Sequence, residues 1–277
     1  MWNIISHLEL TSPMVQRELV NSIYIGMSIL ESFTPKKRFY TLSEITKIVN
    51  APKSSVFRLL KTFCRLDYLQ YDTENKRYCL GPRILSLGFA FLLSLEIRDI
   101  VRPYLEKLAR ECDKTVNLTM LDKGEMVYID KIKVHDLRDL NINIGERIPV
   151  HNTAAGKAVL AYLDPQRLLA IIKEIKRGRG VLQEIGQNGS RLLKALAEVR
   201  TKGYAMNDQE FRKGVRAIAV PILSPQGANY SISMVVASEI LSIEELTGKY
   251  APKLIKIGNE VSKAAGYYKG KGPIRVE

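Results

Sequence analysis

The chain has 277 residues, 46% of them hydrophobic and 26% charged, and this balance excludes an intrinsically disordered protein. Its length leaves room for two domains of ordinary size. The formal net charge of +13 favours nucleic acid or another polyanion as a partner, although a basic surface can also serve solubility alone.

The first third of the chain has the pattern of a helix-turn-helix. Apolar residues at helical spacing predict a helix over residues 14–34. A hydroxyl cap at Thr41 and an acidic first turn at Glu44 predict a second helix, which Pro52 ends. A third helix is expected from Lys53 to about Leu66. It has an apolar face and a face of hydroxyls and cations, namely Val56, Leu59, Leu60, Phe63 and Leu66 against Ser54, Arg58, Lys61 and Arg65.

Two short β-like runs around a polar turn at residues 72–75 predict a hairpin after the third helix. In this position the hairpin would be the wing of a winged helix, with Lys76 and Arg77 near its tip. The expected order is therefore a winged helix-turn-helix domain over residues 1–81.

An apolar run, ILSLGFAFLLSL, occupies residues 84–95. As a helix it would span only about 18 Å at roughly 1.5 Å per residue, against roughly 30 Å of bilayer hydrocarbon, so we expect no membrane contact. The run is apolar on nearly every side and lies between two predicted domains. We therefore expect a linker helix over residues 82–97 that pairs with its copy in a second chain, with burial inside its own chain as the alternative.

From Arg98 onward, mixed helices and strands predict an α+β domain around an antiparallel sheet, over residues 98–267. Helices are expected at 98–112, 153–163, 165–176, 188–202 and 242–265, and strands at 116–121, 125–132, 140–144, 215–223 and 230–237. Residues 176–180 are predicted to form a basic loop, and residues 268–277 a loosely ordered tail.

The cysteines and histidines predict neither disulfides nor a metal site. The three cysteines, Cys64, Cys79 and Cys112, are far apart and form no C-x-x-C pair, and the three histidines have no metal-ligand spacing. We therefore expect no metal and no other cofactor. Residues 1–12 lack a basic region followed by a long apolar core, so we expect no signal peptide and a reducing cytoplasm as the location.

The segment 149–162, PVHNTAAGKAVLAY, resembles part of a phosphate-binding loop at Gly156 and Lys157. A Walker loop needs a glycine five residues before that pair and Ser or Thr after it, whereas this chain has His151 and Ala158 there. We also expect no strand of buried apolar residues before the segment. The sequence therefore argues against a nucleotide and predicts the start of a helix whose free N–H groups face a pocket and attract anions or carboxylates.

Several segments together resemble the IclR family of bacterial and archaeal transcription regulators. They are PKSSVFRLL at 52–60, YCLGPR at 78–83, HNTAAGKA at 151–158, GYA at 203–205, and Gly214 followed by AVPI at 219–222. The resemblance covers roughly residues 15–265. It implies a winged helix joined by a linker helix to a GAF-like effector-binding domain. It also implies a homodimer, often a dimer of dimers (a homotetramer), whose grip on double-stranded DNA changes when a small organic effector binds.

In the first domain, the exposed start of the third helix is the part expected to enter the major groove. Our candidates for base-edge and near-phosphate contacts are Ser54, Ser55 and Arg58. Our candidates for phosphate contacts are Lys53, Lys61, Lys76, Arg77 and the hydroxyls of Thr41 and Ser43. A merely solvated face is the alternative.

In the second domain, the resemblance implies an effector pocket. The candidate effector-binding residues are Ala154, Ala155, Gly156, Asn207, Asp208, Ala217, Val235 and Ala237. Family members that hold a small keto acid can have an acidic residue, a cysteine and two serines where this chain has Asn207, Ala217, Val235 and Ala237. These departures predict a less polar pocket and a more apolar, aromatic or carboxylate-bearing ligand. A shift of the register by one or two residues would bring in Asp208, Ser231 and Ser233 instead.

Two other classes of protein remain as alternatives. An enzyme is less favoured because the sequence has no G-x-S-x-G, no H-E-x-x-H and no paired Cys/His motif, so no catalytic residue is predicted. His151 near Asp208 or Glu210 could act as a base, but a lone His before a helix is more often structural. A sequence-neutral DNA-coating protein fits the charge without needing a ligand domain. A C-terminal domain that only assembles the oligomer is the alternative to effector binding.

Overall fold

The computed structural model describes residues 20–134, 142–176 and 180–267. These residues divide into two compact units, which meet between Ser94 and Leu95 in the chain. The first six residues of the predicted first helix, most of the basic loop at 176–180 and the tail at 268–277 lie outside the described ranges.

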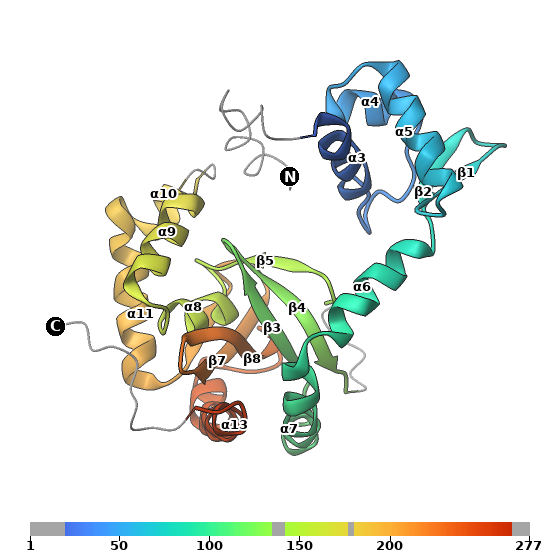
Figure 1. Ribbon diagram of the computed structural model, residues 1–277. Coiled ribbons are helices and arrows are strands. Elements are labelled where there is room, and N and C mark those ends of the chain that lie inside the picture. The colour runs from blue at the N-terminus through green and yellow to red at the C-terminus, as the bar shows by residue number, and fades with distance from the viewer. Residues whose placement is uncertain (1–19, 135–141, 177–179, 268–277) are drawn as a thin grey trace. The chain divides into compact units, whose positions relative to one another are not determined.

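The N-terminal unit is a winged helix-turn-helix, as the sequence predicted (Figure 1). Its helices are α3 (Asn21–Glu31), α4 (Leu42–Val49) and α5 (Lys53–Arg65), and its hairpin is β1 (Leu69–Asp72) with β2 (Arg77–Leu80). The strands pair antiparallel. Tyr40, just before α4, exchanges two backbone hydrogen bonds with Tyr78 of β2, at 3.0 and 2.7 Å, and these bonds fix the wing to the helices.

The core of this unit lies among the three helices and the hairpin. It consists mainly of Ile25, Ile29, Phe33, Tyr40, Ile45, Val56, Leu60, Leu69 and Tyr78. Val56 and Leu60 are fully buried, which confirms the predicted inner face of α5. Leu66 is a correction, because 47% of it is exposed. The helix ends at Arg65, so Leu66 lies beyond the last turn and no longer follows the apolar face.

Helix α6 (Arg83–Leu93) follows the wing. Against the described part of the chain, none of its residues is buried. Five large apolar side chains on it are about half exposed or more, namely Leu85, Leu87, Phe89, Phe91 and Leu93. An apolar helix of this kind requires cover that the described residues of its own chain do not supply.

The C-terminal unit is built on one antiparallel sheet of order β5-β4-β3-β8-β7-β6. Its strands are β3 (Val116–Asp122), β4 (Glu125–Ile132), β5 (Arg147–Pro149), β6 (Ala205–Asp208), β7 (Val215–Ser224) and β8 (Gly227–Ala237). Its helices are α7 (Glu96–Cys112), α8 (Ala154–Leu160), α9 (Pro165–Ile175), α10 (Val181–Ile185), α11 (Ser190–Lys202), α12 (Ile243–Glu245) and α13 (Ala251–Ala264). The expected α+β class is confirmed.

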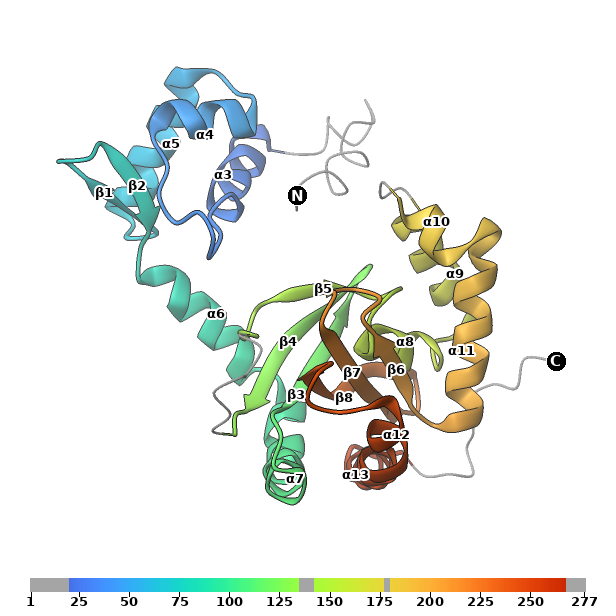
Figure 2. The ribbon, with the colours of Figure 1, turned by 180° about the vertical axis from the view of Figure 1, so that it is seen from behind.

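The helices cover the two faces of this sheet differently. Helices α7 and α13 contact each other and lie on one face, while α8 packs on the other face with α11 beyond it (Figure 1; Figure 2 shows the same arrangement from behind). The sheet is therefore buried between two layers, as expected for a helix-covered α+β domain.

Two short strands and two helical details differ from the sequence prediction. Residues 142–144 form no strand, because Gly145 turns the chain with φ 86° and the strand begins only at Arg147. This strand, β5, leads into the Gly-Lys segment, but only Ile148 of its three residues is buried, so it is not a strand of buried apolar residues. Strand β6 and helix α10 were not predicted. The closing helix contains a π-helical turn, Leu246–Tyr250, just before Pro252, which has no N–H to donate.

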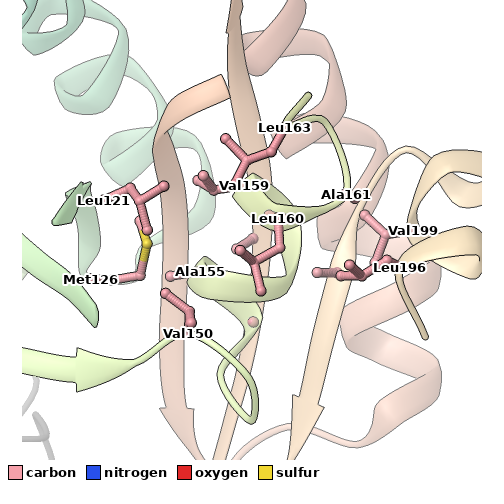
Figure 3. Close-up of a cluster of buried hydrophobic side chains, with 14 of the residues drawn as sticks. Leu121, Met126, Val150, Ala155, Val159, Leu160, Ala161, Leu163, Leu196 and Val199 are labelled. Carbon is pink, nitrogen blue, oxygen red and sulfur yellow. The ribbon is translucent and has the colours of Figure 1, made fainter. Parts of the chain in front are cut away.

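Helix α8 lies closer to the neighbouring backbone than a side chain would permit. Figure 3 shows Val159 and Leu160 of α8 within a cluster of buried apolar side chains, with Leu196 and Val199 of α11 nearby. A Cβ atom at Gly156 of the same helix would lie 2.2 Å from the carbonyl oxygen of Val150. Gly156 is therefore required for packing.

We predict that Gly156→Ala lowers the free energy of unfolding by about 1–3 kcal/mol, because the new methyl group would meet backbone that cannot easily move. Urea unfolding followed by circular dichroism would measure the loss. Gly248→Ala is the matched control, since a Cβ atom there meets nothing within 4 Å and alanine favours helix. Equal midpoints for the two variants would contradict the steric explanation.

Candidate nucleic-acid interface and ligand pocket

The start of α5 has an exposed surface of polar side chains. Ser54, Ser55 and Arg58 are exposed, on the side of the helix away from buried Val56 and Leu60. Within the described part of the chain, these three side chains form no hydrogen bond or ion pair. They are therefore available to an external partner, and Arg can bind guanine through two hydrogen bonds.

Lys53 and Lys61 extend the positive charge along the same helix. Both are exposed, and the Lys61 ammonium lies 5.0 Å from the centre of the Phe57 ring. A cation held over an aromatic ring keeps its charge and remains accessible. These placements suit contacts with phosphate, which position a protein without reading sequence.

The predicted phosphate ligands on α4 are not equivalent. The Thr41 hydroxyl accepts the Glu44 N–H at 3.3 Å and donates to the Glu44 carboxylate at 3.0 Å, so it is occupied as the helix cap. Hydrogen bonds from Lys37 first, and then from Thr41, lower the pKa of Glu44 to about 2. Ser43 is exposed. Of the two hydroxyls, only that of Ser43 has no partner among the described residues.

The tip of the wing is held in shape by Asp72. Its carboxylate accepts the N–H groups of Glu74 and Asn75, each at 3.0 Å, and the Asn75 side-chain amide at 2.7 Å. These bonds, chiefly the backbone bond from Asn75, lower the pKa of Asp72. Lys76 then takes a left-handed conformation, with φ 51°, and both Lys76 and Arg77 are exposed. The wing therefore presents two cations at its tip.

The C-terminal unit contains a hollow between the sheet and the start of α8. It holds roughly 600 Å³ of space, including its open mouth. Its lining is mainly apolar, from Tyr128, Ile142, Ile148, Ala154, Ala155, Phe211, Val215, Ala217 and Val235. The polar lining residues are Glu146, Thr153, Asn207, Arg212 and Ser233.

Five of the eight predicted effector-binding residues line this pocket, namely Ala154, Ala155, Asn207, Ala217 and Val235. The other three are not among its lining. Gly156 is packed against Val150, and the Asp208 carboxylate accepts a bond from Arg216 at 2.7 Å, which lowers its pKa. Ala237 is the last residue of β8 and pairs with Val215.

Ser233 was missed as a site residue, although a shifted register would have included it. Ser231, Ser233 and Val235 alternate along β8 and so share one face of the sheet. The Ser231 hydroxyl bonds to that of Thr119 at 2.7 Å. Ser233 instead lines the pocket beside Val235 of the chosen register. Of the three residues that a shifted register would bring in, Ser233 lines the pocket and Asp208 and Ser231 do not.

Lys157 ties the β6–β7 loop to α8. Its ammonium is buried and donates to both carboxylate oxygens of Glu210, at 2.7 and 2.9 Å. The Asn207 amide also donates to the carbonyl of Asn152, just before α8. Phe211 and Arg212 follow Glu210 directly and reach the pocket mouth. The lysine of the Gly-Lys pair thus positions a loop, and its charge is already compensated.

His151 is not paired with Asp208 or Glu210, the arrangement in which it could act as a base. Its Nε2 atom is 3.0 Å from Glu184, and its buried Nδ1 atom has no partner within the described residues. Burial lowers the pKa of His151, and Glu184 only partly offsets this effect. Asp208 and Glu210 are bonded instead to Arg216 and Lys157.

The described ranges contain neither a membrane-spanning helix nor a cluster of metal ligands. No helix there is long and apolar enough to cross a membrane. Nor does any group of three or more His, Cys, Asp or Glu side chains in these ranges form a candidate metal site.

A helix-turn-helix unit followed by an α+β unit with a pocket defines a two-part DNA-binding regulator. A family model described as the bacterial transcriptional regulator IclR C-terminal matches residues 89–263, and an IclR helix-turn-helix domain matches residues 22–73. The chain belongs to the IclR family of transcriptional regulators.

Its relatives include characterised regulators. The HTH-type transcriptional regulator XynR of Escherichia coli K12 is 30% identical over 257 residues, which cover 90% of this chain and 98% of XynR. A solved IclR family regulator from Brucella abortus is 27% identical, with a TM-score of 0.78 over 95% of this chain and 99% of that one. An IclR homologue from Microbacterium hydrocarbonoxydans, complexed with 4-hydroxybenzoate, shares the fold at 20% identity and a TM-score of 0.70, over 88% of this chain and 98% of that one.

We predict that Glu210→Gln destabilises the protein by about 1 kcal/mol, because it leaves the buried Lys157 ammonium without its counter-charge, while the half-exposed position of Glu210 limits the loss. Adding Lys157→Met should recover most of that loss. A double-mutant cycle of urea midpoints measures the coupling. Glu239→Gln, at an exposed position, is the control. If the effects of Glu210→Gln and Lys157→Met simply add, the Lys157–Glu210 ion pair contributes nothing to stability.

Proposed function

We propose that this protein is a ligand-responsive regulator that binds a specific double-stranded DNA sequence through α5 and the wing. The main support is that Ser54, Ser55 and Arg58, at the start of α5, are exposed and form no side-chain hydrogen bond or ion pair with the described residues. We assign residues 1–81 to DNA binding, 82–97 to the linker, 98–267 to effector binding and 268–277 to a tail, and we place the protein in the cytoplasm with its DNA.

The pocket supports a second partner, a small organic effector. Its lining is apolar with a few converging polar groups, which is the usual character of a small-molecule site. Ser233, which lines the pocket, has a buried hydroxyl without a hydrogen-bond partner among the described residues. A C-terminal unit that only assembled the oligomer would not need such a group. The pocket lining holds no nucleophile bonded to a base, so we propose no catalysis.

We predict that Arg58→Ala and Lys61→Ala weaken DNA binding in different ways. Loss of Arg58 should cost roughly 1–3 kcal/mol on the specific duplex and little on a scrambled one, because only base contacts discriminate. Loss of Lys61 should weaken binding to both duplexes alike. It should also reduce, by about one, the slope of the logarithm of the binding constant against the logarithm of the salt concentration.

The measurement is fluorescence anisotropy on duplexes tiled across the gene's own upstream region, at physiological salt with random competitor DNA. The tile that binds best supplies the specific duplex. Equal losses on both duplexes for Arg58→Ala would remove its base-reading role. Equal binding of all tiles by the unaltered protein would favour the sequence-neutral alternative.

We also propose that α6 pairs with its copy in a second chain, giving a homodimer or a dimer of dimers. The exposed apolar side chains on several sides of this helix support the proposal.

We predict that Leu85→Glu with Phe89→Glu shifts the protein to monomers, because two carboxylates would be buried in the apolar contact. Sedimentation velocity measures the change in mass. Ser86→Glu on the same helix is the matched control and should leave the oligomer intact. An unchanged mass for the double variant would place the contact elsewhere.

A further inference from the structure

Helix α5 carries an exposed aromatic side chain within its polar surface. Of the described side chains of α5, Phe57 is the only large apolar one that is exposed, with an exposed fraction of 40%. Phe57 directly follows Val56, which is fully buried. Leu59 and Phe63 of the same helix pack against the core of the N-terminal unit, and Phe57 is not among the side chains that do so. The fold therefore does not use the Phe57 ring as a core residue.

The position of Phe57 distinguishes it from the single exposed apolar residues that are normal on protein surfaces. Residues three and four positions apart on a helix are neighbours on its surface, so Ser54 and Lys61 lie on either side of Phe57 along α5. Both belong to the surface that we propose for DNA. Arg58, the proposed base-reading residue, follows Phe57 directly in the sequence. The ring thus shares a surface with the proposed DNA contacts.

The ring of Phe57 is held by its neighbour Lys61. The Lys61 ammonium lies 5.0 Å from the ring centre, and a cation at this distance is attracted to the face of the ring. The two side chains therefore favour a common arrangement. A side chain that is already ordered loses less conformational entropy when a partner covers it, so Phe57 is suited to a contact with defined geometry.

The major groove of B-DNA offers such a ring an apolar group, the C5-methyl group of thymine. The other groups that the base pairs present in this groove are hydrogen-bond donors and acceptors, which a phenyl ring cannot satisfy. A polar base edge covered by the ring would lose its hydrogen bonds to water, and this loss is unfavourable. An aromatic side chain at this place therefore favours thymine over the other bases.

We propose that Phe57 recognises a thymine of the operator through contact between its ring and the thymine C5-methyl group, while Arg58 and Ser54 form hydrogen bonds with other bases. This inference rests on the proposed function, the binding of a specific duplex through α5. It adds a specificity-determining residue and the base that this residue recognises.

The test replaces each thymine of the specific duplex in turn by uracil, which keeps the hydrogen-bonding groups of thymine and lacks only its methyl group. Fluorescence anisotropy measures the dissociation constant of the unaltered full chain for each substituted duplex. We expect affinity to fall about fourfold at the thymine that Phe57 contacts, because the burial of one methyl-sized group has about this effect on a binding constant.

Two variants assign the effect to the ring. Phe57→Ala should bind the thymine and uracil duplexes equally at that position, and Phe57→Leu, which keeps an apolar side chain, should retain most of the preference for thymine. Leu66→Ala is the matched control. Leu66 is an apolar residue of the same unit with an exposed fraction of 47%, but it lies beyond the end of α5, so the control should keep the full preference. Circular dichroism confirms that each variant is folded.

The outcomes separate this assignment from the broader function. Unchanged affinity at every uracil position would overturn the role of Phe57, as would a preference for thymine that persists in Phe57→Ala or disappears in Leu66→Ala. In each of these cases, specific binding by the unaltered protein would leave the DNA-binding role intact. If the unaltered protein prefers no duplex, the proposed function fails and the role of Phe57 fails with it.

Discussion

The contact between Gly156 and the backbone of Val150 is the constraint on which the site depends. Because no side chain separates them, α8 can lie against the strand end that precedes it. That position places Ala154 and Ala155 in the pocket wall and directs Lys157 beneath Glu210. One glycine thus determines both a wall of the hollow and the anchor of the loop over its mouth. The resemblance to a phosphate-binding loop is superficial, since this glycine approaches protein backbone and this lysine is paired.

A bulge in β4 allows this strand to contribute side chains both to the pocket and to the contact with α7. The register with β3 shifts between Leu118 and Thr119, so Tyr128 and Asp130, two residues apart, face opposite sides of the sheet. Tyr128 lines the pocket, and burial raises its pKa, which keeps the phenol neutral. Asp130 accepts bonds from Arg102 of α7 at 3.2 Å. The pocket wall and the first helix of the C-terminal unit therefore share a strand, and in the chain α7 directly follows the DNA-binding unit.

The sequence predicted those features whose causes are local. The cap at Thr41, the two-faced third helix and the long alternating strands all depend on residues close together in the chain. Strand β6 was missed because its buried positions are Ala205 and Asn207, which give no apolar alternation. Leu66 was misplaced because helical periodicity does not show where a helix ends. The pair Val235 and Ala237 was chosen in place of Ser233 and Val235 because a shift of two residues preserves the face of a strand but moves each side chain along it.

The unsatisfied polar side chains of Ser233 and Asn117 do not stabilise the fold. A buried polar group without a partner costs about 1–3 kcal/mol, and an apolar residue of similar shape would avoid that cost. Thr119 and Ser231 avoid it by bonding to each other, so the sheet can accommodate a satisfied polar pair at this depth. Ser233 and Asn117 lie beside them without partners within the described chain, and Ser233 lines the open hollow. An external hydrogen-bonding group would satisfy such a residue, and this is the physical basis for the proposal that the hollow binds a ligand.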